Sequence, residues 1–313
     1  MYFKNAQIYR LPAPWAMQLE TLAAALAERP FVECSSQQSE SRGWTFPREE
    51  GQLVRALGSQ WLICLKVATR MLPASVVKQE LEKRVAQMEK DSGAKVTRRE
   101  RRDLKEQIAV ELLAKAFVRY RSVFAWIDPV NGWLVVDTSS KSKADEVIEV
   151  LSDTITPLDL ALPNTNLAPT AVMTEWLANG EAALKFQLAG DCSLRAGAAD
   201  SRSVTYRNGL DDSHIQEHLA QGKQPLNLSL TYADRLTFTL TDALELRKIK
   251  LLDVTREAVD GVEGGDEISN AEFALMTGEL QKVLKDLIEV HGGEVAPVSA
   301  DASASDTEQK EAA

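Results

Sequence analysis

Hydrophobic and polar positions change their period several times along the chain, which predicts strands and helices in irregular alternation. The opening segment 3–11 alternates imperfectly and suits a strand, and the apolar run 60–67 is typical of a buried strand. Residues 16–29 carry apolar side chains at helical spacing, and Pro30 ends that helix. A polar loop with a short strand is expected over 34–50.

Two consecutive helices are expected next. The Asp91-Ser92-Gly93 sequence ends the first, and Thr97 followed by Glu100 fits a capping box that opens the second. We expect the second helix to run to about Arg121, and the modest apolar content of the pair predicts a helical hairpin that projects from the body. The apolar face of the first helix is formed by Val77, Leu81, Val85 and Met88.

The remainder combines hairpins with further helices. Asn131-Gly132 between two β-rich runs predicts a hairpin, and the proline-containing segment 157–169 is a candidate domain boundary. Adjacent strands joined by hairpins favour an α+β fold over a parallel doubly wound sheet. The expected helices are 143–151, 171–177, 211–221 and 275–290, and the expected strands are 186–188, 194, 203–206, 226–232, 236–240 and 246–252.

Composition limits the class of protein. The chain has 313 residues, 44% of them hydrophobic and 26% charged, as in ordinary globular proteins. No apolar run approaches the ~18 residues that a membrane-spanning helix needs, and the start lacks the pattern of a secretory signal. Cys34, Cys64 and Cys192 form no CxxC pair, so the expected compartment is the reducing cytoplasm.

Charge is distributed unevenly. Lys and Arg number 36 against 46 Asp and Glu, a net charge of −10. The window 76–121 nevertheless holds 13 basic and 8 acidic residues, a net of +5, whereas 253–313 holds 15 acidic and 4 basic residues, a net of −11. Such asymmetry can support a local anion-binding surface on an acidic protein.

The second predicted helix carries the most promising chemistry. At ~100° per residue its basic side chains fall within roughly a 100° arc, a face that can neutralise phosphates without reading bases. The alternative is an ordinary solvated helix, and no homeodomain, zinc-finger or RRM signature supports nucleic-acid binding. The residues on this arc are Arg98, Arg101, Arg102 and Lys105.

Other motifs are sparse. The sequence contains no GxxxxGK[ST], no GxGxxG after a strand and no GxSxG. His214, Glu217 and His218 match the H-x-x-E-H pattern of inverted zinc peptidases, but a third ligand such as Glu289 can be nominated only arbitrarily. So short a pattern arises easily by chance, and the alternative is two solvated histidines on a surface helix. Phe117 fits either a core position or an exposed anchor for a partner.

A set of sequence blocks, in a fixed order, resembles the RdgC family over nearly the whole chain to Glu294. The blocks are YFKNAQIYRL from Tyr2, Gly43-Trp44, LPASVVKQELEKRV from Leu72, AFVRYRSVFAWIDPVNGWLVVD from Ala116, MTEWLANG from Met173, FQL from Phe186, LMTGEL from Leu275 and LIEVHGGE from Leu287.

This resemblance implies a non-enzymatic, cytoplasmic, nucleoid-associated DNA-binding protein without cofactor. Two horseshoe-shaped subunits are expected to close into a homodimeric ring around duplex DNA. Such a ring binds without marked sequence preference, single strands included, and restrains RecA-promoted strand exchange in DNA recombination. The helical hairpin then supplies part of the DNA-binding charge through Lys78, Lys83, Arg84, Arg98, Arg101, Arg102 and Lys105.

The resemblance also implies two subunit contacts and a division of the chain. One contact involves Phe117 in the A-F-x-R-[FY] segment, and the other involves Arg207 and Asn208, where the family has a Lys-Gln pair. The central α+β region is expected to hold a mixed or antiparallel sheet. The expected parts are 1–75 and 117–160 in that region, 76–116 as a helical tip, 161–294 as an α/β base with remaining central strands, and 295–313 as a disordered acidic tail.

Two other functions stay open at this point. One is a zinc metallopeptidase built on His214, Glu217 and His218, which metal analysis would detect. The other is a dimeric scaffold whose contact with DNA is incidental, which salt-dependent binding to a random duplex would distinguish.

Overall fold

The computed structural model describes residues 2–48, 51–196, 202–207, 209–210, 213–256 and 264–295. Asn208 and the acidic segment from Ala296 onward therefore lie outside the described residues. The chain divides into two compact units: a middle unit of residues 11–159, and a terminal unit of residues 1–10 with 160–313.

The middle unit is built on an antiparallel sheet with strand order β6-β5-β4-β2, and β3 pairs with β4. The two longest strands, β4 and β5, pair from Trp61 opposite Ile127 to Met71 opposite Phe117. The strands and helices of this unit are α1 (Leu19–Ala27), β2 (Glu40–Thr45), β3 (Arg55–Leu57), β4 (Gln60–Met71), α2 (Ala74–Ser92), α3 (Arg98–Lys115), β5 (Phe117–Asp128), β6 (Trp133–Val136) and α4 (Lys141–Thr154).

The turn between β5 and β6 follows the Asn-Gly prediction. Gly132 has φ +70°, and a Cβ there would lie 2.5 Å from the carbonyl oxygen of Leu11, so only glycine fits without a shift. Helix α4 buries Ala144, Val147, Val150 and Leu151, and two ion pairs also join it to strands of the sheet. Arg121 contacts Glu146, and Arg42 lies 2.6 Å from Glu149.

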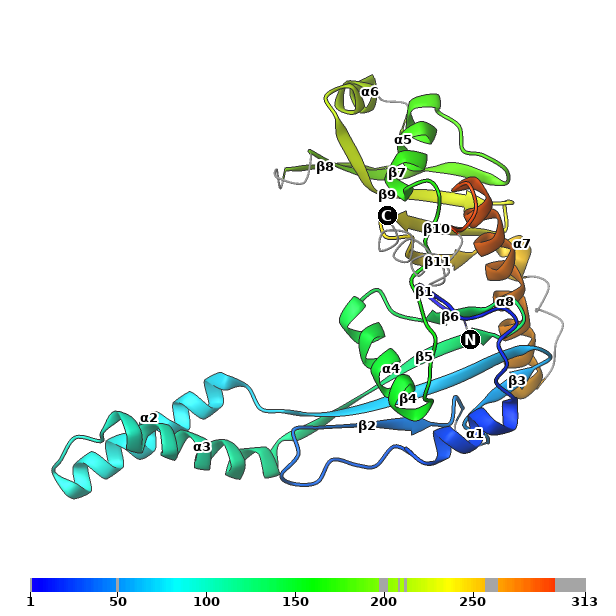
Figure 1. The fold of residues 1–313 in the computed structure, drawn as a ribbon. Helices are drawn as coiled ribbons and strands as arrows, with labels where there is room; N and C mark the ends of the chain where they lie inside the picture. The colour runs from blue at the N-terminus through cyan, green and yellow to red at the C-terminus, as the bar shows by residue number, and fades with distance from the viewer. Residues whose placement is uncertain are drawn as a thin grey trace, which may run out of the picture. The chain divides into compact units, whose positions relative to one another are not determined.

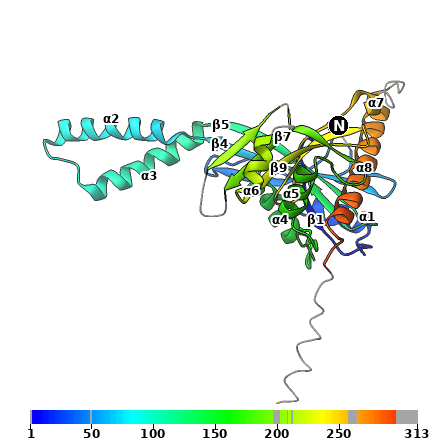
Figure 2. The same cartoon turned by 90° about the horizontal axis from the view of Figure 1, so that it is seen from above.

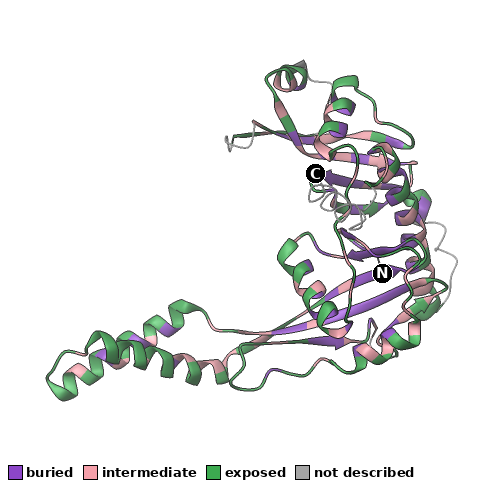
Figure 3. Ribbon diagram, in the orientation of Figure 1, coloured by how far each residue is buried: buried purple, intermediate pink, exposed green. Residues whose placement is uncertain are grey.

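Helices α2 and α3 lie side by side and extend away from the sheet beyond the ends of β4 and β5 (Figures 1 and 2). The two helices share a small core of Val77, Leu81 and Val85 from α2 with Ile108 from α3. Most of the remaining surface of the helix pair is exposed (Figure 3). The buried strip follows the helical spacing read from the sequence, although Met88 is 43% exposed.

One predicted boundary in this unit is wrong. We expected the second helix to reach about Arg121, but α3 ends at Lys115, Ala116 is extended, and residues from Phe117 belong to β5. The reason is long-range: each residue from Phe117 to Arg121 has a partner on β4, and pairing over the whole strand outweighs local helix propensity.

The terminal unit holds the second antiparallel sheet, with strand order β11-β10-β9-β7-β8. Two antiparallel sheets with helices confirm the α+β prediction. The elements of this unit are β1 (Gln7–Arg10), α5 (Pro169–Asn179), β7 (Phe186–Ala196), β8 (Ser203–Tyr206), α6 (Ser213–Ala220), β9 (Lys223–Tyr232), β10 (Leu236–Thr241), β11 (Leu246–Leu251), α7 (Asp253–Arg256) and α8 (Gly265–Val290).

Helix α8 begins ten residues before the predicted start at Leu275, and its buried residues lie between Phe273 and Leu287. Its Asp286 accepts a hydrogen bond from the Tyr232 hydroxyl at 2.7 Å and pairs with Lys185 at 3.0 Å. Although burial opposes ionisation, these two partners hold the pKa of the Asp286 carboxyl below its usual range. Among the described residues, no helix is both long and apolar enough to cross a membrane.

Candidate nucleic-acid interface

The start of α3 is fixed by the predicted capping box. The Thr97 hydroxyl accepts the Glu100 N–H at 3.3 Å, and the Glu100 carboxylate accepts the Thr97 N–H at 2.8 Å. The Thr97 N–H and, at 2.8 Å, the Thr97 hydroxyl both donate to the Glu100 carboxylate, and these two hydrogen bonds lower the pKa of Glu100. The cap sets where the helix begins, so Arg98, Arg101 and Lys105 occupy its first two turns.

Some of the predicted DNA-binding cations already have acidic neighbours. Arg84 on α2 lies 2.6 Å from Glu111 on α3 and 3.2 Å from Glu80, and its hydrogen bonds lower the pKa of Glu111. This arginine therefore links the two helices. Lys78 lies 3.9 Å from Glu82, and Arg102 lies 3.8 Å from Asp103 and 3.9 Å from Glu106.

The other predicted cations point to solvent. Lys83, Arg98, Arg101 and Lys105 are all exposed, and within the part of the chain that the structure describes no ion pair joins them to an acid. Exposed pairs such as Arg102 with Glu106 are weak and exchange readily. The first two turns of α3 thus present exposed cations, which suit contacts with phosphates.

Phe117 is not a core residue of its own chain, since its exposed fraction is 86%. It is the first residue of β5 and lies directly opposite Met71 on β4, which is 52% exposed. Directly opposed residues of an antiparallel pair project to the same face. An exposed two-residue apolar patch of Phe117 and Met71 therefore lies beside the base of the helix pair.

Arg70 holds this junction together, and sequence reasoning missed it. Its guanidinium donates to the carbonyls of Leu113 and Ala116 at 3.3 Å each, at the C-terminal end of α3. It also donates to the carbonyls of Cys34 and Ser35 at 3.2 and 3.1 Å. A cation at a helix C-terminus satisfies orphan carbonyls and interacts favourably with the helix dipole. No local motif signals this role, because the acceptors come from distant segments.

The A-F-x-R-[FY] segment has two faces. The side chains of Phe117 and Arg119 lie on one face of β5, and the side chain of Tyr120 lies on the opposite face. There the Tyr120 hydroxyl donates to Glu33 at 2.6 Å, and the Lys66 ammonium lies 4.9 Å from the tyrosine ring centroid. All three side chains are exposed, but Tyr120 is also tied to its own chain by these contacts.

The second predicted contact is described only in part. Arg207 directly follows the edge strand β8 and is exposed. Asn208 lies outside the described residues. The role of both residues in a subunit contact stays a prediction.

The H-x-x-E-H residues do not form a ligand set. His214 and Glu217 are each 65% exposed, and Nδ1 of His218 lies 2.6 Å from the Lys223 ammonium. A neighbouring ammonium disfavours cation binding. Across the described ranges, no group of three or more His, Cys, Asp or Glu side chains could hold a metal ion. The metallopeptidase alternative therefore has no support.

Comparison with known proteins gives the class of protein. A family model described as "Putative exonuclease, RdgC" matches residues 1–294. Similar proteins named "Recombination-associated protein RdgC" come from Dechloromonas aromatica (strain RCB), 43% identical, and Janthinobacterium sp. (strain Marseille), 41% identical. Each alignment covers 94% of this chain and 99% of the relative. The chain belongs to the RdgC family.

Proposed function

We propose that this protein binds DNA without sequence specificity, as a homodimeric ring around the duplex, and restrains RecA-promoted strand exchange during recombination. Its place of action is the nucleoid in the cytoplasm, and its role is non-enzymatic. The observation that carries the DNA-binding part is the cationic face formed by Arg98, Arg101 and Lys105 on α3. The recombination-associated names of the relatives favour the same biological setting.

The physics of a ring fits these features. Contacts with phosphates supply affinity without reading the base sequence, and closure of the ring around the duplex keeps the protein on the DNA. The helix pair forms the tip of the proposed horseshoe. Phe117 forms one subunit contact and the segment at Arg207 and Asn208 forms the other. The exposed Phe117 ring supports this assignment, because aromatic side chains are frequent anchors of protein interfaces.

The experiment that tests DNA binding is a salt titration. Affinity for two unrelated duplexes of equal length should be similar and should fall by roughly 0.9 log units per decade of salt for each phosphate neutralised. Reversing Arg98, Arg101, Arg102 and Lys105 together to Glu should weaken binding and flatten this slope. A thousandfold preference for one duplex at fixed salt would contradict non-specific binding.

A matched pair of variants separates a local from a general charge effect. Arg101→Glu with Lys105→Glu removes two cations from the α3 face. Lys141→Glu with Lys143→Glu makes the same charge change at two exposed positions of α4. Only the first variant should lose affinity. If both variants lose the same affinity for DNA, the DNA contact lies elsewhere or the loss reflects the net charge of the protein.

A further inference from the structure

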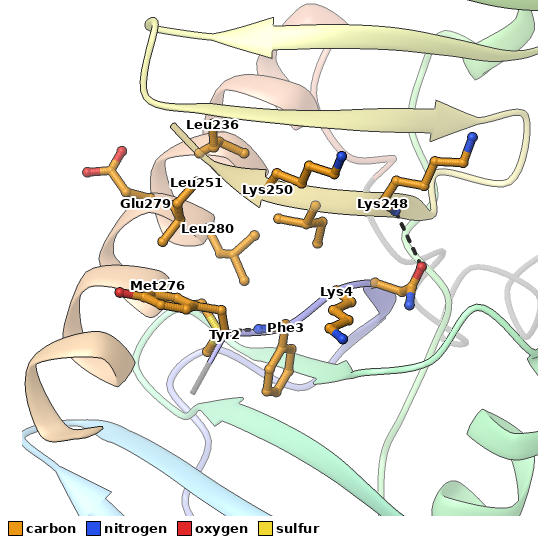
Figure 4. Close-up of a pocket in the computed structure, with 12 residues that line it drawn as sticks. Tyr2, Phe3, Lys4, Leu236, Lys248, Lys250, Leu251, Met276, Glu279 and Leu280 are labelled. Atoms are coloured by element: carbon orange, nitrogen blue, oxygen red, sulfur yellow. Dashed lines mark hydrogen bonds between the residues drawn. The ribbon is translucent and has the colours of Figure 1, made fainter. Parts of the chain in front are cut away.

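The terminal unit contains an apolar cavity of about 820 Å³ (Figure 4). Four segments build its walls: residues 2–5, the start of strand β10, strand β11 and helix α8. Its apolar lining comes from Phe3, Leu236, Ile249, Leu251, Met276 and Leu280. A cavity of this volume can accept large side chains of a ligand.

Backbone contacts fix these walls to one another. The Ile249 N–H donates to the carbonyl of Lys4 at 2.8 Å, and Ala6 and Leu246 exchange hydrogen bonds of 2.7 and 3.1 Å. On the other side, the Phe3 N–H donates to the Met276 sulfur at 3.0 Å. The cavity is therefore largely preformed, which lowers the entropic cost of binding.

The two ends of the cavity differ in charge. Exposed Lys4, Lys248 and Lys250 lie at one end, and Glu279 lies at the other (Figure 4). Glu279 is compensated by Arg235 at 2.9 Å and Lys282 at 3.0 Å. Over the described ranges, no acidic side chain pairs with Lys248 or Lys250. The cavity thus combines an apolar interior with a cationic rim at one end.

We propose that this cavity is a docking site for an acidic peptide segment of a partner protein. One or two large apolar side chains of the peptide fill the cavity, and its carboxylates lie beside Lys248 and Lys250. Burial of apolar area supplies most of the affinity, and the lysine rim sets the direction of the peptide. The proposal goes beyond DNA binding and does not depend on it.

Two other occupants fit less well. The chain's own segment 296–313 carries Asp301, Asp306, Glu308 and Glu311, but Val298 is its largest apolar side chain and would leave much of the cavity empty. Nucleic acid would satisfy the lysines, yet placing a base in this cavity requires unstacking it from its neighbours. An acidic peptide with large apolar side chains meets both requirements.

The test is fluorescence anisotropy with an array of fluorescein-labelled nonapeptides. Each peptide carries four acidic residues and two apolar positions varied over Leu, Ile, Met, Phe and Trp. The best binders should lose about tenfold or more in affinity when both apolar residues become Ser. Lys248→Glu with Lys250→Glu should weaken binding by about tenfold, whereas Lys141→Glu with Lys143→Glu should have no effect.

Three outcomes would overturn the proposal. In the first, no peptide binds more tightly than its Ser-substituted counterpart. In the second, peptides bind only after residues 296–313 are deleted, which would assign the cavity to the chain's own segment. In the third, Lys248→Glu with Lys250→Glu weakens binding of a random duplex as much as that of the peptides. Loss of DNA binding in the α3 variants would leave the peptide result unaffected, so the two proposals fail separately.

Discussion

At 86% exposure, the ring of Phe117 gains little from the fold of its own chain. Phe117→Ser should therefore leave the melting temperature of the protein nearly unchanged at low concentration, where association contributes little. Thermal unfolding followed by circular dichroism measures this. The matched control is Phe273→Ser, because Phe273 is fully buried and its loss should cost about 3–5 kcal/mol. If both variants melt at similarly lowered temperatures, Phe117 has a structural role that its exposure does not reveal.

Buried His291 should make the stability of the protein depend on pH. The imidazole is fully buried, and Nδ1 lies 2.6 Å from the Leu287 carbonyl oxygen. Burial lowers its pKa below the ordinary value of 6.5, although the hydrogen bond opposes the shift. Below pH 6.5 the unfolded chain binds a proton that the folded chain does not, so the free energy of unfolding should fall as pH decreases from there to the folded pKa.

Urea unfolding at pH 8 and pH 5.5 measures this effect. The free energy of unfolding should differ less between pH 8 and pH 5.5 in His291→Gln than in the wild-type protein, whatever the stability of the variant at pH 8. The control is His214→Gln, because His214 is 65% exposed and should leave the difference unchanged. Equal pH dependence in the wild-type protein and His291→Gln would show that other groups carry it.

At the scale of helices and strands, the features that depend on residues close together in the sequence were predicted correctly. The Thr97 capping box, the apolar strip of α2 and the Asn131-Gly132 hairpin each depend on residues a few positions apart, and each is present in the structure. Helix α8 was predicted too short, because its first turns lack the strong apolar repeat of residues 275–290.

The end of α3 could not be predicted in this way. Val118 and Tyr120 suit either a helix end or a strand, and only the long partner strand β4 decides between them. The same pairing places Met71 beside Phe117 and brings Arg70 to the carbonyls of Ala116 and Leu113. The candidate cations were visible as a helix face, but the junction that positions them depends on sheet register, which no local pattern encodes.

At the scale of the whole molecule, the net charge argues against DNA binding, whereas the local charge of one segment favours it. The chain carries −10 overall, yet the window that contains α2 and α3 carries +5. Phosphate contacts respond to the local field at one face, which the net charge of the whole chain does not determine. An acidic isoelectric point is therefore compatible with DNA binding by a small cationic surface.

Ring closure makes a topological prediction that charge alone does not make. On a closed circular plasmid challenged with excess competitor DNA, a closed ring can leave only by opening, whereas on a linear plasmid it can slide off an end. Dissociation of the wild-type protein should therefore accelerate several-fold when one restriction cut linearises the plasmid, measured by loss of fluorescent protein from tethered DNA. A nicked circle is the control, because it loses supercoiling but has no ends.

The Phe117→Ser protein should dissociate from circular and linear DNA at similar rates, because an open horseshoe can leave the duplex sideways. If nicked circles and linear DNA release the wild-type protein equally fast, retention comes from phosphate contacts alone and the protein does not encircle the duplex.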